Sequence, residues 1–176
     1  CRYDVDGVHF EREYFASYPD QLLVVRLSAS RRGALHFTVC PEIPYIKNYA
    51  KEPGDGGGKS GKVEAEGDTI TLSGRMHYYN IQFEGQIKVI AESGTVTAEG
   101  GAIQVKGAST AVLLIAIGTN YKLESRVFLE KDPKLKLKDA NVHQIICERI
   151  EQGSRKEYAD LRERHLTDYQ ALFARV

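Results

Sequence analysis

Few residues of this chain have the type and spacing that catalysis requires. The nearest approach to a nucleotide-binding loop is the run Gly54 to Gly58, followed by Lys59 and Ser60. A phosphate-binding loop needs four residues between its glycines, a buried strand before it and a helix after it. Here three residues separate the two glycines, Pro53 precedes the run and another glycine follows it. The pattern therefore argues against phosphate binding.

The histidines lie in separate segments, and none is paired with another potential ligand at metal-ligand spacing. They are His9, His36, His77, His143 and His165. His165 and Asp168 are three residues apart on a predicted helix, where a surface hydrogen bond or an interface contact is the simpler interpretation. No pair of carboxylates stands out, and there is no nucleophile elbow. The sequence predicts no catalytic residue, no metal site and no cofactor.

The cysteines are Cys1, Cys40 and Cys147. Their odd number and wide spacing argue against a disulfide framework and against a zinc site. Cys40 and Cys147 each follow apolar residues. We therefore expect both to be buried and to pack as small hydrophobic side chains.

Charge and hydropathy exclude two classes of partner. Lys and Arg together number 24, as do Asp and Glu, so the net charge is zero. Nucleic-acid-binding domains usually carry a basic excess, so we expect no nucleic-acid partner. The longest apolar run, residues 111–117, is too short to cross a bilayer, and we expect no membrane partner. The cellular location stays open between cytoplasmic and secreted.

Asp6 and Gly7 predict a tight hairpin at the start of the chain. Tyr3 and Val5 alternate with polar residues before this pair, and Val8 and Phe10 do so after it. Asp-Gly between two alternating runs is a strong hairpin signal. A chain that opens inside a hairpin is expected to be a fragment of a longer protein.

Short apolar or alternating runs, separated by turn residues, continue to residue 117. The expected strands are 22–27, 34–39, 69–74, 76–90, 95–98, 102–106 and 109–117. Many short strands at close spacing are typical of an antiparallel β-sandwich, and the last strand, apolar on both faces, is expected at its centre. We expect residues 28–33 to form a hairpin loop and residues 41–62 a long flexible loop. Gly85 indicates a bulge or a close backbone approach.

The last third of the chain changes to a helical period. Leu135 to Ile150 predicts a first helix that Gly153 ends, and Ser154 and Glu157 have the spacing of a capping box. A second helix follows, with large apolar side chains along one face. This stripe consists of Tyr158, Leu161, His165, Leu166, Tyr169, Leu172 and Phe173. We expect all of these residues except His165 to form an interface.

The sequence has one polar and aromatic cluster, Tyr78, Tyr79 and Asn80. Tyrosine rings can stack on sugar faces while their hydroxyls form hydrogen bonds, so the cluster could line the rim of a sugar cleft. Neighbouring strand residues point to opposite faces, however, and ordinary packing is the simpler interpretation.

Two stretches resemble the N-terminal domain of glycoside hydrolase family 95. The first reads YFASYPDQLLVVRL at residues 14–27, followed by GALHF at residues 33–37. The second reads YADLRERHLTDYQALFARV at residues 158–176, close to the helix that ends the family's domain. Their order and separation also fit, so the resemblance covers nearly the whole chain.

The resemblance implies a non-catalytic piece of an inverting α-L-fucosidase-like enzyme. Residues 1–130 would form a β-sandwich of the super-sandwich type that lacks its first strands, and residues 131–176 a helical linker. The catalytic carboxylates would lie beyond Val176, in an (α/α)6 barrel that this domain supports. The partners implied are that barrel and, through the whole enzyme, a fucosylated oligosaccharide.

Two other functions fit the same sequence. One is a stand-alone carbohydrate-binding module, and the other is a sandwich used for protein–protein contact. The large apolar stripe and unpaired sheet edges also predict that the isolated chain associates with itself.

Overall fold

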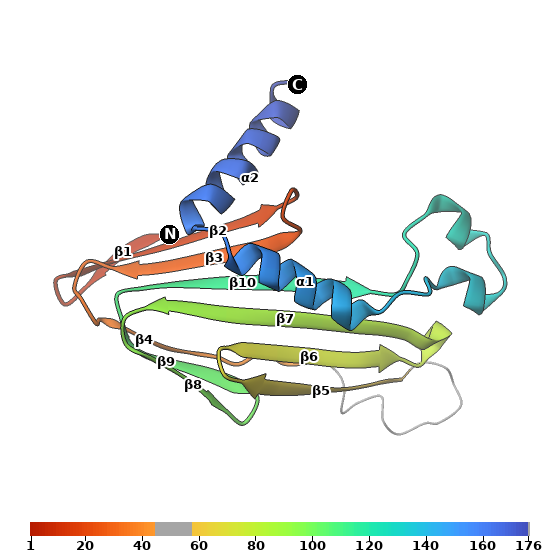
Figure 1. Cartoon of the computed structure of the whole chain (residues 1–176), viewed down its shortest axis with the longest axis horizontal. Helices are drawn as coiled ribbons and strands as arrows, with labels where there is room; N and C mark the ends of the chain where they lie inside the picture. Colours follow the sequence, from red (N-terminus) through yellow and green to blue (C-terminus); the bar gives the residue numbers. More distant parts are fainter. Residues whose placement is uncertain (45–57, 176) are drawn as a thin grey trace.

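Ten antiparallel strands form two facing sheets in the computed structural model, which describes residues 1–44 and 58–175 (Figure 1). The strands are β1 Arg2–Val5, β2 Val8–Ser17, β3 Leu22–Ala29, β4 Leu35–Val39, β5 Lys59–Glu66, β6 Thr69–Met76, β7 Ile81–Glu92, β8 Thr95–Glu99, β9 Ala102–Ala108 and β10 Thr110–Thr119. The large sheet has the order β1-β2-β3-β10-β7-β6-β5, and the small sheet the order β4-β9-β8. The predicted antiparallel β-sandwich is confirmed.

The Asp6-Gly7 pair forms the hairpin that the sequence predicts. Val5 pairs with Val8, which leaves a two-residue turn between β1 and β2. Both turn residues have positive φ, 51° at Asp6 and 72° at Gly7. A type I′ turn requires this conformation at both positions, and glycine adopts it without steric cost.

β10 and β3 lie at the centre of the large sheet and are buried on both faces. Leu113 of β10 and Val25 of β3 face the small sheet, where they join an inner core that includes Ile70 and Ile103. Alternate residues of the same two strands, such as Leu114, face the helices on the opposite side. The expectation that residues 109–117 form a central strand is confirmed, because side chains on both faces find apolar partners.

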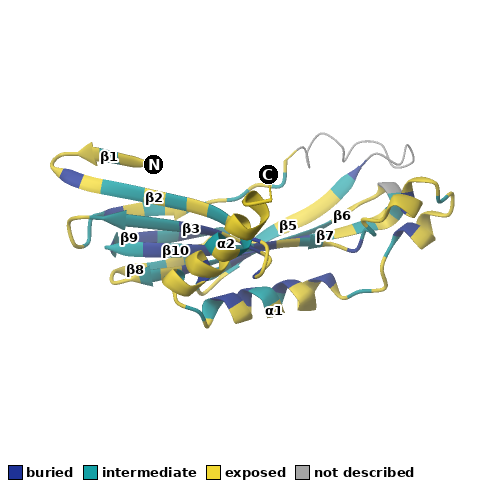
Figure 2. Ribbon diagram, turned by 90° about the horizontal axis from the view of Figure 1, so that it is seen from above, coloured by how far each residue is buried: buried dark blue, intermediate teal, exposed yellow. Residues whose placement is uncertain are grey.

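Two α-helices follow the strands, and the first covers the outer face of the large sheet. Helix α1, Val142–Ser154, buries Ile146 and Ile150 against this face (Figure 2). Helix α2, Tyr158–Phe173, buries Leu161 near its start and then points away from the sheets (Figure 1). No described helix is both long and apolar enough to cross a membrane.

The sequence predicts a hairpin loop at residues 28–33, but the structure shows a different connection. β3 pairs with β2 and β10 in the large sheet, whereas β4 pairs with β9 in the small sheet. The chain therefore crosses here from one layer of the sandwich to the other. Gly33 has a φ of 73° and allows the chain to change direction. The largely polar composition of residues 28–33 suits a hairpin and a crossing equally.

The predicted first helix starts later than its apolar period indicates. Residues Pro133–Lys136 form a 3-10 turn, and Leu137 forms an isolated bridge with Tyr121. Asn141 then starts α1, because its side chain accepts a hydrogen bond from the backbone N–H of Gln144. Gly153 does not end the helix but lies within it.

The capping box predicted at Ser154 and Glu157 is absent. The Ser154 hydroxyl donates to the carbonyl of Glu151, and Glu157 occupies the N-cap position of α2 without a side-chain cap bond. Because α1 extends to Ser154, the serine belongs to the end of one helix rather than to the beginning of the next.

The structure corrects two smaller expectations, at the cysteines and at residue 76, and excludes one of the two alternatives at Gly85. Cys40 is exposed and Cys147 is partly exposed, because Cys40 lies just past the end of β4 and Cys147 at the margin of the buried face of α1. The strand expected from residue 76 begins at Ile81, after a 3-10 turn. At Gly85 the strand register is continuous, so the glycine reflects a close approach of Ile117 rather than a bulge.

The predicted loop at residues 41–62 lies largely outside the described residues. Its last part, from Lys59 onwards, belongs to strand β5. The boundary expected between a sandwich and a linker at residue 130 stays a prediction.

Two glycines allow α1 to lie close to the large sheet. A Cβ at Gly118 of β10 would come 3.1 Å from Cδ1 of Ile146, and a Cβ at Gly153 would come 2.3 Å from Cδ1 of Leu22. The second distance is far below van der Waals contact, and Leu22 is itself buried. A side chain at position 153 would therefore push the helix from the sheet or force Leu22 out of its packed rotamer.

We expect Gly153→Val to destabilise the chain by about 2 kcal/mol, because it overpacks this contact. Urea denaturation followed by circular dichroism measures the free energy of unfolding. Gln152→Val is the matched control, since Gln152 is the neighbouring helical residue and is exposed. The control should change stability by less than about 0.5 kcal/mol. Equal effects of the two variants would contradict close packing at Gly153.

Candidate functional site

The turn between β2 and β3 carries a buried carboxylate. The side chain of Asp20 is 1% exposed. The Ser17 hydroxyl donates to Asp20 Oδ2 at 2.7 Å, and the Asp20 backbone N–H donates to Ser17 Oγ at 3.3 Å. These two local bonds fix the orientation of the carboxylate within the turn.

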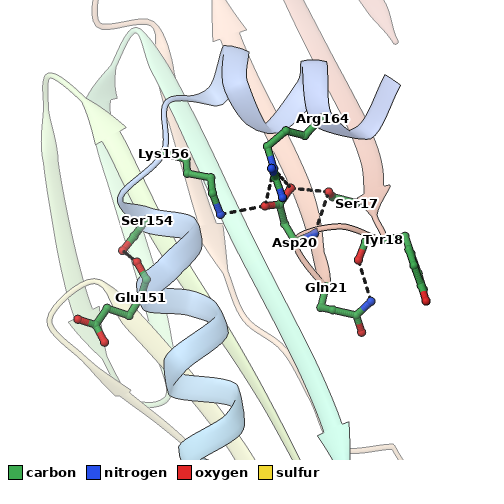
Figure 3. A network of polar contacts seen from close by, with 8 residues as sticks. All are labelled: Ser17, Tyr18, Asp20, Gln21, Glu151, Ser154, Lys156 and Arg164. Atoms are coloured by element: carbon green, nitrogen blue, oxygen red, sulfur yellow. Dashed lines mark hydrogen bonds and ion pairs between the residues drawn. The ribbon is translucent and has the colours of Figure 1, made fainter. Parts of the chain in front are cut away.

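Two cations from the helical part of the chain bind this carboxylate (Figure 3). Lys156, between α1 and α2, places Nζ 2.9 Å from Asp20 Oδ1. Arg164, on α2, places Nε 3.0 Å from Oδ1 and 3.3 Å from Oδ2. Asp20 therefore joins the β2–β3 turn to segments 136 and 144 residues later in the sequence. We call Ser17, Asp20, Lys156 and Arg164 the Asp20 latch.

The environment of Asp20 favours its charged form. Burial alone would raise the pKa of the carboxyl, but the hydrogen bonds from Ser17 and Lys156 and the positive charge of Lys156 outweigh burial. The pKa of Asp20 is therefore lowered from the ordinary value of 3.8. The latch is fully ionised at neutral pH.

A second polar contact joins β2 to the first turn of α2. The hydroxyl of Tyr158 donates to Glu13 Oε2 at 2.8 Å, and the guanidinium of Arg26 lies over the Tyr158 ring, 5.1 Å from its centroid. Burial and the bond to Glu13 raise the pKa of Tyr158 to about 12. Arg162 also lies 3.5 Å from Glu13 Oε1. The start of α2 is thus fixed by several contacts to this part of the sheet.

The apolar stripe of α2 is buried at one end and exposed at the other. Leu161 is 1% exposed, and His165 stacks on Phe15 of β2 with a centroid distance of 4.9 Å. Beyond this stack, Tyr169 and Phe173 form a further stacked pair at 5.9 Å, yet Phe173 is 67% exposed. The last two turns of α2 present aromatic and aliphatic surface that no described residue covers.

A polar cluster lies where α1 begins to cross the sheet. Glu84 is mostly buried and accepts from Gln86 at 3.1 Å, and its Oε1 is 2.8 Å from His143 Nδ1. The Cys147 sulfur is 3.5 Å from His143 Nε2 and 3.9 Å from Nδ1. A sulfur in line with the Nε2 lone pair would be much farther from Nδ1. The three groups are therefore not aligned for proton relay, and the described residues contain no metal-binding group of three ligands.

The cluster Tyr78 to Asn80 forms the 3-10 turn before β7. Tyr79 and Asn80 both have a φ of 58°. The ammonium of Lys136 lies 5.0 Å from the Tyr79 ring centroid, and Arg75 donates to the Asn80 side chain. These contacts suit ordinary packing, and a role in a sugar cleft stays a prediction.

Sequence reasoning found the stripe but missed the latch. Nothing in the local spacing around Asp20 indicates that its carboxylate meets Lys156 and Arg164. The residues of the predicted interface differ in burial. Leu161 is buried within the chain, whereas Tyr169, Leu172 and Phe173 are exposed.

The fold and these contacts define a class: a two-sheet sandwich domain whose last helix extends from it and exposes apolar side chains at its far end. The sequence model of the glycosyl hydrolase family 65 N-terminal domain matches residues 1–124. The chain belongs to this family of N-terminal domains.

Individual relatives are longer carbohydrate-active proteins. The chain is 30% identical to alpha-L-fucosidase 2 of Arabidopsis thaliana over 99% of its length, and 24% identical to a protein named as a probable alpha-fucosidase A of Aspergillus niger over 94%. It spans 21% and 20% of these two relatives. The matches confirm the prediction of an N-terminal domain of the fucosidase-like glycoside hydrolase type.

A solved structure supports the fold. A protein from the human microbiome, named as a kojibiose phosphorylase, superposes with a TM-score of 0.55 and 10% identity. The superposition covers 93% of this chain and 21% of that protein. At this identity the likeness concerns the fold alone.

We expect Asp20→Asn to lower the free energy of unfolding at pH 7 by about 2–4 kcal/mol, because Lys156 and Arg164 lose their buried counter-charge. Both cations are partly exposed, which places the loss below that of a fully buried pair. Urea denaturation of the wild-type chain and the variant measures the difference.

The pH dependence has a definite sign. Asp20 has a lowered pKa, so its contribution is complete above the unfolded value of 3.8 and is lost as the pH falls through the folded value. The stability gap between the wild-type chain and the Asp20→Asn variant should therefore shrink below about pH 4. A gap that stays constant from about pH 7 to about pH 2 would contradict an ionised latch.

Proposed function

We propose that this chain is a non-catalytic N-terminal domain with its helical linker, from a longer inverting α-L-fucosidase-like enzyme of glycoside hydrolase family 95. Its function is to support an (α/α)6 catalytic barrel that follows Val176 in the whole protein. The substrate of that enzyme would be a fucosylated oligosaccharide. The proposal joins the closing helix motif at residues 158–173 to the names of the two relatives.

The exposed end of α2 is the observation that carries the scaffold role. The Asp20 latch and the Glu13–Tyr158 contact fix where the helix leaves the sandwich. Its last turns nevertheless expose Tyr169, Leu172 and Phe173. Burying a leucine or phenylalanine side chain contributes about 1.5–3 kcal/mol, so this surface favours a partner domain. The relatives are about five times as long as the matched stretch, which leaves room for that domain.

Complementation tests the scaffold role. The chain and the separately produced remainder of the parent protein are mixed, and release of chromophore from a chromogenic α-L-fucoside is followed. We expect turnover by the mixture and none by the chain alone, since the described residues hold no catalytic constellation. Turnover that tracks with the purified chain alone would overturn the assignment as non-catalytic.

Paired variants locate the contact on α2. Leu172→Asp with Phe173→Asp should lower the restored activity more than about tenfold, because two apolar side chains leave the interface. Thr167→Asp with Gln170→Asp adds the same charge to exposed positions of the same helix and should leave activity nearly unchanged. Equal activity of the two double variants would exclude this end of α2 from the contact.

The isolated chain should associate with itself at high concentration. The stripe end of α2 is exposed, and β1 and β5 are the edge strands of the large sheet within residues 1–44 and 58–175. Sheet edges of this kind can pair with another chain. Light scattering should give a mass above 19.7 kDa, the mass of one chain, that falls towards this value in the Leu172→Asp, Phe173→Asp variant. A monomer at every concentration would show that the surface does not drive association.

A further inference from the structure

A small lobe lies between the last strand and the first α-helix. It consists of residues 120–138 and contains the 3-10 turns Ser125–Phe128 and Pro133–Lys136. The lobe projects past the end of the sheets at which β10 finishes (Figure 1). It is separate from both the Asp20 latch and the exposed end of α2. We call it the side lobe.

Backbone hydrogen bonds close the base of the side lobe. The N–H of Lys138 donates to the carbonyl of Asn120 at 2.6 Å, and the N–H of Lys122 donates to the carbonyl of Lys136 at 2.9 Å. The side-chain oxygen of Asn120 also accepts from the backbone N–H of Gln82 at 2.8 Å. The base of the lobe is therefore fixed to the start of β7.

The interior of the side lobe holds a lysine side chain. Lys136 is 6% exposed, and its ammonium donates to the carbonyl of Val127 at 2.8 Å. The same ammonium lies 5.0 Å from the ring centroid of Tyr79. A buried cation is stable only with partners of this kind. Because the bond to Val127 joins the two 3-10 turns, it also fixes the shape of the lobe.

Large apolar side chains lie on the surface of the side lobe, although its interior holds a cation. Leu123 and Leu129 are each 86% exposed, Phe128 is 75% exposed, and Leu135 is 54% exposed. Among the described residues, no other large apolar side chain is as exposed as these two leucines. Single exposed apolar residues are normal on a protein surface, but four within one small lobe indicate a contact surface.

The charges of the side lobe favour a protein partner over a lipid bilayer. Six of its residues are Lys or Arg and three are Asp or Glu. Lys136 is buried, so five cations and three carboxylates are at least partly exposed. The carboxylates Glu124, Glu130 and Asp132 are interspersed with the cations, and an anionic bilayer would repel them. An apolar protein surface with an acidic rim complements the lobe better.

The length of the relatives indicates where such a surface comes from. The chain spans 21% and 20% of the two relatives, so about four fifths of each lies outside the matched stretch. Helix α2 leaves the sheets beside β2, and its last turn carries the exposed Leu172 and Phe173 (Figure 1). The side lobe leaves the adjacent edge of the same sheets, at the end of β10. One domain beyond Val176 can therefore reach both elements.

We propose that the side lobe is a second contact surface for the domain that follows Val176 in the whole protein. Phe128 and Leu129 enter the apolar part of the contact, and Lys131 and Lys134 meet carboxylates at its rim. The closed base and the buried lysine hold the lobe in one shape, so little conformational entropy is lost on contact. This inference rests on the scaffold role proposed above and extends it to a second site.

Site-specific photo-cross-linking in the whole parent protein tests the proposal. p-Benzoyl-phenylalanine replaces Leu129, Leu172 or Val5 in separate variants, and mass spectrometry identifies the captured peptides after irradiation. We expect the probe at Leu129 to capture a peptide from beyond Val176 in which Asp and Glu outnumber Lys and Arg. Leu172 reports the contact of α2. Val5 is the control, since it is exposed on β1 at the opposite end of the sheets, and should capture no such peptide (Figure 1).

A double variant gives a second measurement. Phe128→Ser with Leu129→Ser should lower the melting temperature of the whole protein by about 3 °C or more, because two apolar side chains leave a buried contact. In the isolated chain both residues are already exposed, so the same change should shift the melting temperature by less than about 1 °C. Val5→Ser is the control and should act equally on the two proteins.

The two probes separate this inference from the scaffold role. Capture from Leu172 but not from Leu129 would overturn the contact of the side lobe and leave the scaffold role standing, whereas capture from neither would overturn both. Capture of a second copy of the protein by Leu129, or of lipid from added phosphatidylserine vesicles alone, would assign the lobe to another partner. An equal effect of the double variant on the whole protein and on the isolated chain would also contradict the proposal.

Discussion

The buried Asp20 carboxylate connects the two halves of this chain. It lies in the turn between β2 and β3, but its counter-charges come from the junction before α2 and from α2 itself. A carboxylate at this depth is stable only when hydrogen bonds and opposite charge offset the loss of water. The sandwich therefore places the helices, and the helices in turn satisfy a group that the sandwich could not bury alone.

The large sheet makes this arrangement possible because its central strands are apolar on both faces. One face packs on the small sheet, and the other receives α1 through the glycines at positions 118 and 153. The same outer face carries the Glu84 cluster where α1 begins. The architecture is thus a three-layer body in which the helical layer leaves part of the sheet accessible.

Local pattern predicted most strands, the Asp6-Gly7 hairpin and the apolar stripe, because alternation and helical period act over a few residues. It failed where distant partners decide the outcome. Residues 28–33 cross between sheets because β4 finds its partner in β9, and Gly153 stays helical because Leu22 packs against it. For the same reason, spacing along the chain could not reveal the latch, whose residues come from widely separated segments.

The rigid attachment of α2 has a mechanical consequence. All of its described anchors lie near its first half, and its 16 residues extend about 24 Å at about 1.5 Å per residue. A change in the orientation of α2 would therefore occur as a rotation about its contacts with Asp20. Arg164, which contacts Asp20, lies about 14 Å from Phe173 along the helix axis, so a tilt of about 10° at the latch would move the far end by about 2 Å. The turn between β2 and β3 therefore determines the direction in which the exposed end of α2 points.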